Sequence, residues 1–143
     1  MTVLVDTGVL YADHDTDATR HERASEALEV VYDGELGQPY ISDYIFDEAV
    51  TLTATRMESH ASATTLCEKL RGRDQYPTVY ELLTVSTAVF TDAVSIFERY
   101  ADQELSFTDA TNVALVNRHG LDGVLSFDDD FDGVVSRFDP ARV

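Results

Sequence analysis

The sequence predicts a three-layer α/β/α domain built on a mostly parallel sheet of four or five strands. Short apolar runs, too brief for helices, alternate along the chain with longer segments whose apolar residues recur at helical intervals. This alternation is typical of parallel sheets covered by helices. The chain has 143 residues, of which 44% are hydrophobic. That is enough for one core, so we expect residues 1–143 to form a single domain. A single cysteine, Cys67, excludes an internal disulfide.

The first half of the chain is expected to contribute two strands and three helices. In order, these are a strand at Thr2–Val5, a helix over about 20–32, a strand at Pro39–Ile41, and helices over about 44–57 and 59–71. Thr19 and Glu22 have the spacing of a capping box at the start of the first helix. Asp43 is positioned to cap the second helix, and Gly72 to end the third.

The second half is expected to add up to three strands and two helices. In order, these are a strand near Glu81–Val85, helices over about 87–100 and 109–118, a strand at Gly123–Phe127 and a possible fifth strand at Val134–Phe138. Thr108 is the predicted cap of the second of these helices, and Gly120 its end. We see no internal repeat or linker.

Acidic residues dominate the charge of the chain. There are 27 Asp and Glu residues against 10 Lys and Arg, which gives a formal net charge of −17. This balance normally argues against nucleic-acid binding, which relies on basic patches. Lysine occurs once, as Lys69, and acids are spread over every surface-like segment. That pattern is expected of a halophilic protein, because the screening length falls to about 3 Å at 1 M salt. On this hypothesis, local sites must decide the function.

The N-terminal segment does not resemble a secretion signal, since it lacks a basic region and a small-residue cleavage site. No apolar run approaches the roughly 18 to 20 residues that cross a bilayer. We therefore expect a cytoplasmic protein with no membrane partner.

Four carboxylates stand out because of where the predicted elements place them. Asp6 and Asp128 follow strands, at the edge of the sheet where α/β proteins bind ligands. On a helical wheel, Glu48 lies beside the apolar stripe of its helix, whereas Asp47 lies on the solvated side. Asp109 lies in the first turn of its helix, on an inward face.

Each of these acids also has an ordinary structural explanation. Asp6 could cap the turn that follows it, and Glu48 could bend outward to water. Asp109 is favoured by the helix dipole alone. The run after the last long strand could be a simple acidic turn, in which Asp130 remains an alternative to Asp128.

If these carboxylates meet, they need a countercharge, because each raises the pKa of its neighbours. A hard divalent cation would supply it. Oxygen ligands without Cys or His suit Mg²⁺ or Mn²⁺ and argue against zinc. Such a metal would also let an acidic protein hold an anionic, phosphate-bearing substrate.

Four segments in this order resemble the motifs of PIN-domain ribonucleases, in particular the toxin subunits of VapBC-type toxin–antitoxin pairs: VLVDTGVLYA, SDYIFDEAV, LSFTDATNVALVNRHG and GVLSFDDDF. The resemblance spans nearly the whole chain. It implies that the acidic quartet of the family, which binds metal and carries out catalysis, corresponds to Asp6, Glu48, Asp109 and Asp128. It also implies accessory roles for Thr7, for Ser126 where the family often has Thr, and for Asp130.

The resemblance further implies a PIN-like fold and hydrolysis of RNA phosphodiester bonds that depends on Mg²⁺, with Mn²⁺ as the other candidate ion. It implies a homodimer, and a cognate antitoxin protein that inhibits it.

Two other functions are compatible with the residues. One is a catalytically silent PIN-like module that binds RNA or protein. The other is a different Mg²⁺-dependent phosphohydrolase, such as a receiver domain or a haloacid-dehalogenase-like phosphatase. Those folds would require a lysine late in the chain, whereas Lys69 lies in its middle.

The only basic run is Lys69, Arg71 and Arg73. It is explained by the dipole at a helix C-terminus or by contact with an RNA backbone. Tyr11, close to the first motif, could stack on an unpaired base or pack in the core.

Overall fold

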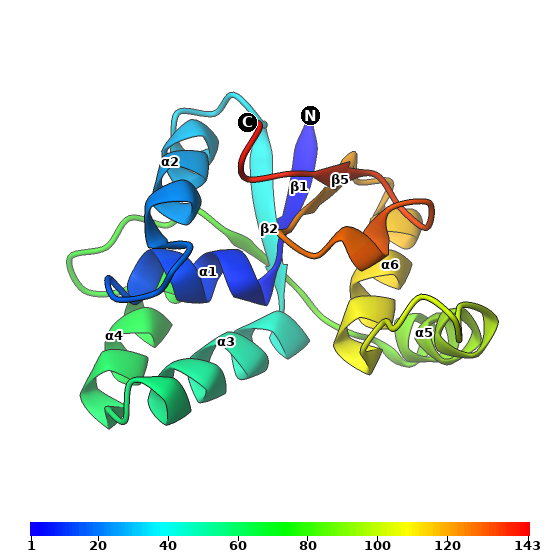
Figure 1. Ribbon diagram of the computed structural model, residues 1–143, viewed down its shortest axis with the longest axis horizontal. Helices are drawn as coiled ribbons and strands as arrows, with labels where there is room; N and C mark the ends of the chain where they lie inside the picture. Colours follow the sequence, from blue (N-terminus) through cyan, green and yellow to red (C-terminus); the bar gives the residue numbers. More distant parts are fainter.

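The computed structural model describes residues 1–143 and contains six α-helices, five strands and one short 3₁₀ helix (Figure 1). In chain order the elements are β1 (Thr2–Val5), α1 (Thr7–His14), α2 (His21–Tyr32), β2 (Gln38–Ser42), α3 (Asp43–Arg56), α4 (His60–Arg71), β3 (Glu81–Leu83), α5 (Thr87–Arg99), α6 (Phe107–His119), β4 (Gly123–Leu125), the 3₁₀ helix η1 (Asp129–Phe131) and β5 (Arg137–Phe138).

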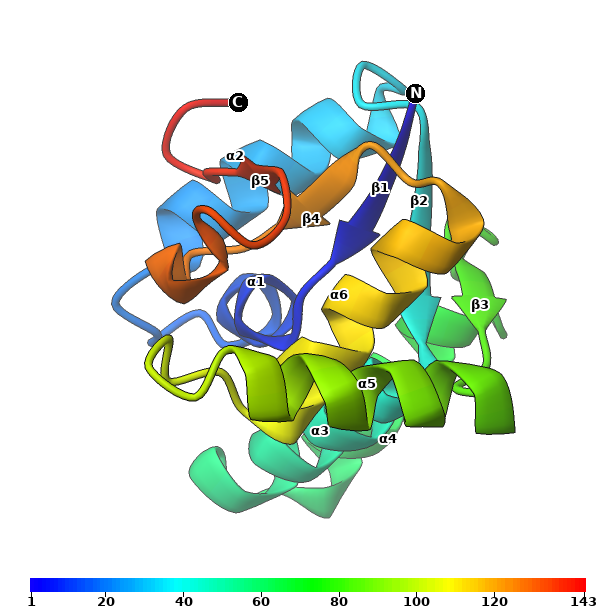
Figure 2. The ribbon, with the colours of Figure 1, turned by 90° about the vertical axis from the view of Figure 1, so that its right-hand side faces the viewer.

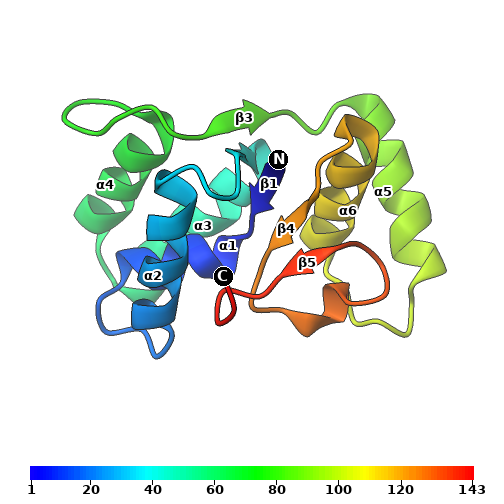
Figure 3. The ribbon, with the colours of Figure 1, turned by 90° about the horizontal axis from the view of Figure 1, so that it is seen from above.

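The sheet is parallel throughout, with the strand order β3-β2-β1-β4-β5. Helices α1 to α4 lie on one side of it, and α5 and α6 on the other (Figures 2 and 3). The predicted three-layer architecture and its parallel sheet are confirmed. The strand order reverses between β1 and β4, and the crevice at the carboxyl ends of such strands is where open α/β sheets bind ligands.

The core is centred on β1, β4 and α6. Val3, Val5 and Leu125 are completely buried. In α6, every residue from Ala110 to Val116 is buried. A helix buried all round is held between two other layers, and α6 is packed between α5 and the sheet (Figure 2). Its packing therefore fixes where the first turn of α6, with Asp109, lies relative to the sheet.

Helix α1 was not predicted from the sequence. It has only eight residues, and its buried side chains, which include Val9, Leu10 and Tyr11, do not form a single stripe. A short segment that buries most of its circumference carries no clear helical period. The signal for its start is Asp6, whose side chain accepts a hydrogen bond from the backbone N–H of Thr7.

Three predicted helix caps are wrong, and the true caps lie one or two residues earlier in two cases. Ser42, not Asp43, caps α3, and Ser106, not Thr108, caps α6. In both helices the serine hydroxyl accepts a hydrogen bond from the backbone N–H three residues later. Asp43 and Thr108 already lie within the helices, whereas a capping residue has extended backbone geometry. Helix α2 begins without any side-chain cap, so the capping box proposed at Thr19 does not form.

Helix ends and strand lengths follow the prediction more closely. Gly72 and Gly120 end α4 and α6 in the left-handed conformation, with φ of 62° and 63°. The last three strands are shorter than expected, because the chain turns away from the sheet at Ser126 and joins it only briefly at Arg137 and Phe138. None of the six helices combines the length and the apolar character needed to span a lipid bilayer.

Candidate functional site

A cleft of about 690 Å³ opens at the carboxyl edge of the sheet, between the segments that follow β1 and β4. Each of the four acids singled out in the sequence lines it, and each comes from a different part of the fold. Asp6 follows β1, Glu48 lies on α3, Asp109 lies in the first turn of α6, and Asp128 follows β4. The sheet edge and two helices thus bring together carboxylates that are far apart in the chain.

Asp6 is the most buried of the four, with 8% of its surface exposed. Its Oδ1 accepts hydrogen bonds from the backbone N–H of Thr7 at 2.9 Å and from Nδ2 of Asn112 at 3.3 Å. Its Oδ2 accepts a hydrogen bond from the hydroxyl of Ser126 at 2.7 Å. Three donors from three elements therefore fix the orientation of this carboxylate. Asp6 both caps α1 and lines the cleft, so the structural role and the role in a ligand site that the sequence suggested are compatible.

Ser126 links two of the acids. Besides donating to Asp6, its Oγ accepts a hydrogen bond from the backbone N–H of Asp128 at 3.0 Å. Ser126 is itself buried, with 1% of its surface exposed. The hydroxyl at this position therefore couples the end of β1 to the turn that follows β4.

Burial and mutual repulsion raise the pKa values in the cleft. Desolvation, with smaller contributions from the charges of Asp109 and Glu48, raises the pKa of Asp6 to about 7, although hydrogen bonds from Ser126 and Thr7 oppose the shift. Burial likewise raises the pKa of Asp109, and the neighbouring charges of Asp128 and Glu48 add to the effect. Carboxylates in this state require a cation to be ionised together at neutral pH.

Glu48 and its neighbour Asp47 differ in exposure, as the predicted helix register requires. Asp47 is exposed, whereas Glu48 is half-buried and lines the cleft. Glu48 accepts no hydrogen bond from the protein, unlike the other three acids of the cleft. Its carboxylate is held only by the position of α3.

Asp109 has two roles at the start of α6. Its Oδ2 accepts a hydrogen bond from the backbone N–H of Ser106, and its own N–H donates to Oγ of Ser106, both at 3.0 Å. This capping box anchors one oxygen of the carboxylate. Ser106 also lines the cleft, so the cap itself forms part of the wall.

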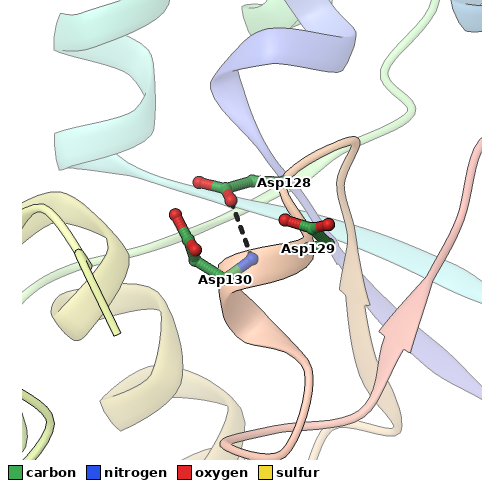
Figure 4. A group of neighbouring side chains, drawn as sticks. All are labelled: Asp128, Asp129 and Asp130. Carbon is green, nitrogen blue, oxygen red and sulfur yellow. Dashed lines mark hydrogen bonds between the residues drawn. The ribbon is translucent and has the colours of Figure 1, made fainter. Parts of the chain in front are cut away.

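The acidic turn after β4 forms a second, tighter group of carboxylates (Figure 4). Oxygens of Asp128, Asp129 and Asp130 all lie within 4.8 Å of one another. Their proximity follows from the 3₁₀ turn, in which Asp130 N–H donates to Oδ1 of Asp128 at 2.9 Å. Asp129 is exposed, and neither it nor Asp130 lines the cleft. We therefore take the cleft, not this turn, as the candidate site, with Asp128 as its member from this segment.

The donors in the cleft fit a hard divalent cation. The four acids offer carboxylate oxygens, and no Cys or His lines the cleft. No arginine or lysine forms a salt bridge with any of the four. Two buried polar atoms next to Asp6, Oγ1 of Thr7 and Oδ1 of Asn112, also have no hydrogen-bond partner. Thr7, which lines the cleft, and Asn112, which donates to Asp6, thus offer further oxygens beside this carboxylate, as Mg²⁺ or Mn²⁺ prefers.

Asn112, Arg20 and Arg56 are among the polar residues of the site that sequence reasoning missed. Asn112 lies three positions after Asp109 on the same face of α6, so helical spacing could have identified it. Arg20 and Arg56 also line the cleft, and no local pattern distinguishes them from other surface arginines. The basic run points elsewhere, because Arg71 and Arg73 line a separate pocket of about 420 Å³.

Comparison with known proteins extends the motif resemblance. The model of a family described as PIN domain matches residues 3–135 of the chain. Ribonuclease VapC26 of Mycobacterium tuberculosis is 29% identical over 126 residues, which cover 88% of this chain and 86% of that protein.

Solved structures share the fold. The crystal structure of Mycobacterium tuberculosis VapC20, described as a Sarcin-Ricin loop cleaving toxin, superposes with a TM-score of 0.75 at 23% identity, over 90% of this chain and 92% of its own. FitAcB from Neisseria gonorrhoeae gives a TM-score of 0.68 at 20% identity over the full length of both chains. A chain of a toxin-antitoxin complex from Klebsiella pneumoniae gives 0.67 at 20% identity over 99% of both.

Proposed function

The chain belongs to the PIN-domain family, and we propose that it is a divalent-metal-dependent endoribonuclease that hydrolyses RNA phosphodiester bonds as the toxin of a toxin–antitoxin pair. The observation that carries this proposal is the convergence of Asp6, Glu48, Asp109 and Asp128 on one cleft, where none of the four forms a salt bridge with a lysine or an arginine. The name of the relative VapC26 supports ribonuclease activity. Membership of this family excludes a receiver domain and a haloacid-dehalogenase-like phosphatase.

We assign Mg²⁺, with Mn²⁺ as the alternative, to the four carboxylates. When bound, such an ion neutralises charge on a phosphodiester and lowers the pKa of a water molecule. Asp6 is the oriented ligand, because its three hydrogen bonds leave it little freedom. Thr7 and Ser126 are accessory residues that hold this carboxylate, and Asp130 supports Asp128 through its backbone N–H.

Glu48 is the group we assign to accept a proton from the attacking water. The other three acids each have an oxygen committed to a hydrogen bond within the protein, whereas both oxygens of Glu48 are free. A general base needs a free oxygen within reach of its proton donor. Glu48 lines the same cleft as Asp6 and Asp109, which meets that requirement.

We propose a cognate antitoxin as the protein partner, a homodimer as the assembly, and a cytoplasmic location. The toxin-antitoxin complex among the similar structures supports an antitoxin. Exposed apolar side chains, Leu82 on β3 with Phe90 and Phe97 on α5, offer surface that a second chain would cover.

A metal titration of RNA cleavage tests the function. Folded protein is incubated with single-stranded RNA and increasing Mg²⁺ or Mn²⁺, and matched samples contain EDTA. We expect cleavage that saturates with metal and disappears with EDTA, and an Asp6→Asn variant that is folded but inactive. Cleavage that persists in EDTA, or an Asp6→Asn variant with wild-type activity, would contradict the assignment.

A further inference from the structure

Two arginines line the acidic cleft without pairing with any acid. Arg20 occupies the N-cap position of α2, and Arg56 is the last residue of α3. Both are exposed, and neither forms a salt bridge. On a chain with 27 acidic residues, free guanidinium groups inside an acidic cleft need an explanation.

Each of these arginines is held against an aromatic ring that also lines the cleft. The guanidinium carbon of Arg20 lies 4.8 Å from the centroid of the Phe127 ring, and that of Arg56 lies 5.2 Å from the centroid of the Tyr11 ring. A guanidinium in a cation–π contact has five N–H donors, so its edge can still bind an anion while the ring holds the side chain. That edge matches two oxygens of a phosphate. Both side chains are thus positioned but still able to bind an anion.

The two pairs are attached to different parts of the acidic site. Phe127 stands between Ser126 and Asp128 in the chain, so the first pair adjoins the segment after β4. Arg56 lies eight residues beyond Glu48 on α3, about 12 Å along the helix axis. It can reach a phosphate further along a bound strand.

We propose that Arg20 and Arg56 bind backbone phosphates of unpaired RNA on either side of the cleaved bond, each as part of an arginine–aromatic pair. This inference rests on the proposed ribonuclease function, and it identifies the substrate as a strand several nucleotides long. RNA is favoured over an acidic protein segment because six acidic residues line the same cleft. Their carboxylates repel acidic side chains, whereas the four assigned to the metal bind a phosphodiester through a divalent ion.

The arginines act on binding and not on the chemical step, which gives a clear kinetic signature. Loss of a charged hydrogen bond weakens binding about tenfold. We therefore expect Arg20→Gln and Arg56→Gln each to raise KM for a single-stranded RNA of about eight nucleotides by about tenfold, with kcat within about twofold of wild type. On a dinucleotide, which has only the cleaved phosphate, the variants and the wild type should be equally active.

The chain provides matched controls. Arg23 lies three residues after Arg20, on the same helix, is exposed and does not line the cleft. Arg99 resembles Arg56 but lies outside the cleft. It is the last residue of α5, and its guanidinium carbon lies 5.4 Å from the ring centroid of Tyr100. Arg23→Gln and Arg99→Gln should leave KM unchanged. Circular dichroism melts of all four variants check that the fold is retained.

The salt dependence of RNA affinity provides a second measurement. Each phosphate contact to a single strand contributes about 0.7 to the slope of log Kd against log salt concentration. We expect the slopes of the Arg20→Gln and Arg56→Gln variants to differ from that of the wild type by about this amount. The comparison is made over one KCl range, and Arg23→Gln and Arg99→Gln, which lose the same single charge, serve as the reference for the change in net charge. Arg20→Lys and Arg56→Lys keep the charge and should restore the slope.

The possible failures can be told apart. If the wild type cleaves RNA and the two cleft variants behave like Arg23→Gln and Arg99→Gln, this inference is overturned and the proposed function stands. If RNA binding depends on both arginines but no metal supports cleavage, the proposed function falls. The placement of the arginines around a cleaved bond falls with it, and only their binding to RNA phosphates is supported. If both variants lose affinity for a poly-glutamate probe while their RNA affinity is unchanged, the cleft arginines serve an acidic protein instead, which overturns the inference.

Discussion

Asp128 belongs to two acidic groups that look equally promising in a list of residues but differ in physical character. One is the cleft quartet, which joins Asp128 to Asp6, Glu48 and Asp109. The other is the turn Asp128–Asp130, whose oxygens are closer together (Figure 4). The turn owes its closeness to three consecutive positions at the start of the 3₁₀ helix η1, of which Asp128 is the N-cap, and its middle residue is exposed. The quartet owes its closeness to the whole fold.

The difference shows that closeness alone does not make an acidic cluster a site. Exposed carboxylates are stabilised by water and need no ion. The carboxylates of the cleft are partly desolvated and raise one another's pKa. A bound cation therefore stabilises their ionised form much more than it would that of exposed carboxylates. The predictions below test whether desolvation or closeness decides which acids matter.

The largest expected effect separates the two groups directly. Asp109→Asn should reduce RNA cleavage by more than about 100-fold at saturating Mg²⁺, because it removes charge from the site while keeping the size of the side chain. Asp129→Asn, its counterpart in the turn, should stay within about twofold of wild type. Initial rates on one RNA substrate measure both. Equal losses in the two variants would mean that the turn matters for cleavage as much as the cleft, which contradicts the distinction between them.

The next prediction compares two adjacent acids on α3. Glu48→Gln should lower kcat by about 100-fold, because the amide cannot accept the proton from water. Asp47→Asn should be nearly silent, because Asp47 is exposed on the opposite side of the helix. A loss of activity in Asp47→Asn, with Glu48→Gln active, would exclude Glu48 from the site.

A third prediction concerns stability, measured without metal at fixed KCl. The folded pKa of Asp6 is raised from 3.8 to about 7, so ionisation of Asp6 opposes folding. The contribution of Asp6 to the free energy of unfolding is therefore fully present below about pH 4. It is lost as the pH rises through 7. The lost contribution is at most about 4 kcal/mol.

Asp6→Asn removes this titration. The amide can still accept from Thr7 and Asn112 through its oxygen, and Ser126 Oγ can accept from its NH₂ group. Chemical denaturation from pH 4 to pH 8 should show the variant gaining stability over the wild type as pH rises. Added Mg²⁺ should reverse the difference by stabilising the wild type. A constant difference across this pH range would mean that Asp6 is ionised at no cost in the folded protein.

The smallest and most general effect concerns salt. With a net charge of −17, long-range repulsion should hinder the approach of RNA at low ionic strength. We expect metal-dependent cleavage to rise several-fold from low to molar KCl, as this repulsion is screened. Circular dichroism at each salt concentration ensures that only folded protein is compared. A steady fall in activity with salt would show that local contacts such as those of Arg20 and Arg56 outweigh the bulk charge, and would count against halophilic adaptation.

Patterns of neighbouring residues were sufficient to predict the local elements and the types of residue at the sheet edge. The strand Thr2–Val5 and the helices that became α3 to α6 have apolar patterns set by neighbours in the chain, so they could be read directly. The same is true of Glu48 and Asp47, whose different fates follow from helix geometry alone. The acids after β1 and β4 could be placed at one edge because parallel strands share a direction.

The arrangement of these strands, helices and side chains in space depends on the tertiary structure. The strand order, the uncapped start of α2 and the burial of α1 depend on contacts between segments distant in the chain. So do the hydrogen bonds from Ser126 and Asn112 to Asp6, and the stacking of Arg20 and Arg56 on Phe127 and Tyr11. The choice between Asp128 and Asp130 also depended on which of them lines the cleft. Desolvation and pairing are set by distances in space, which no local pattern encodes, and these two effects turn scattered acids into one site.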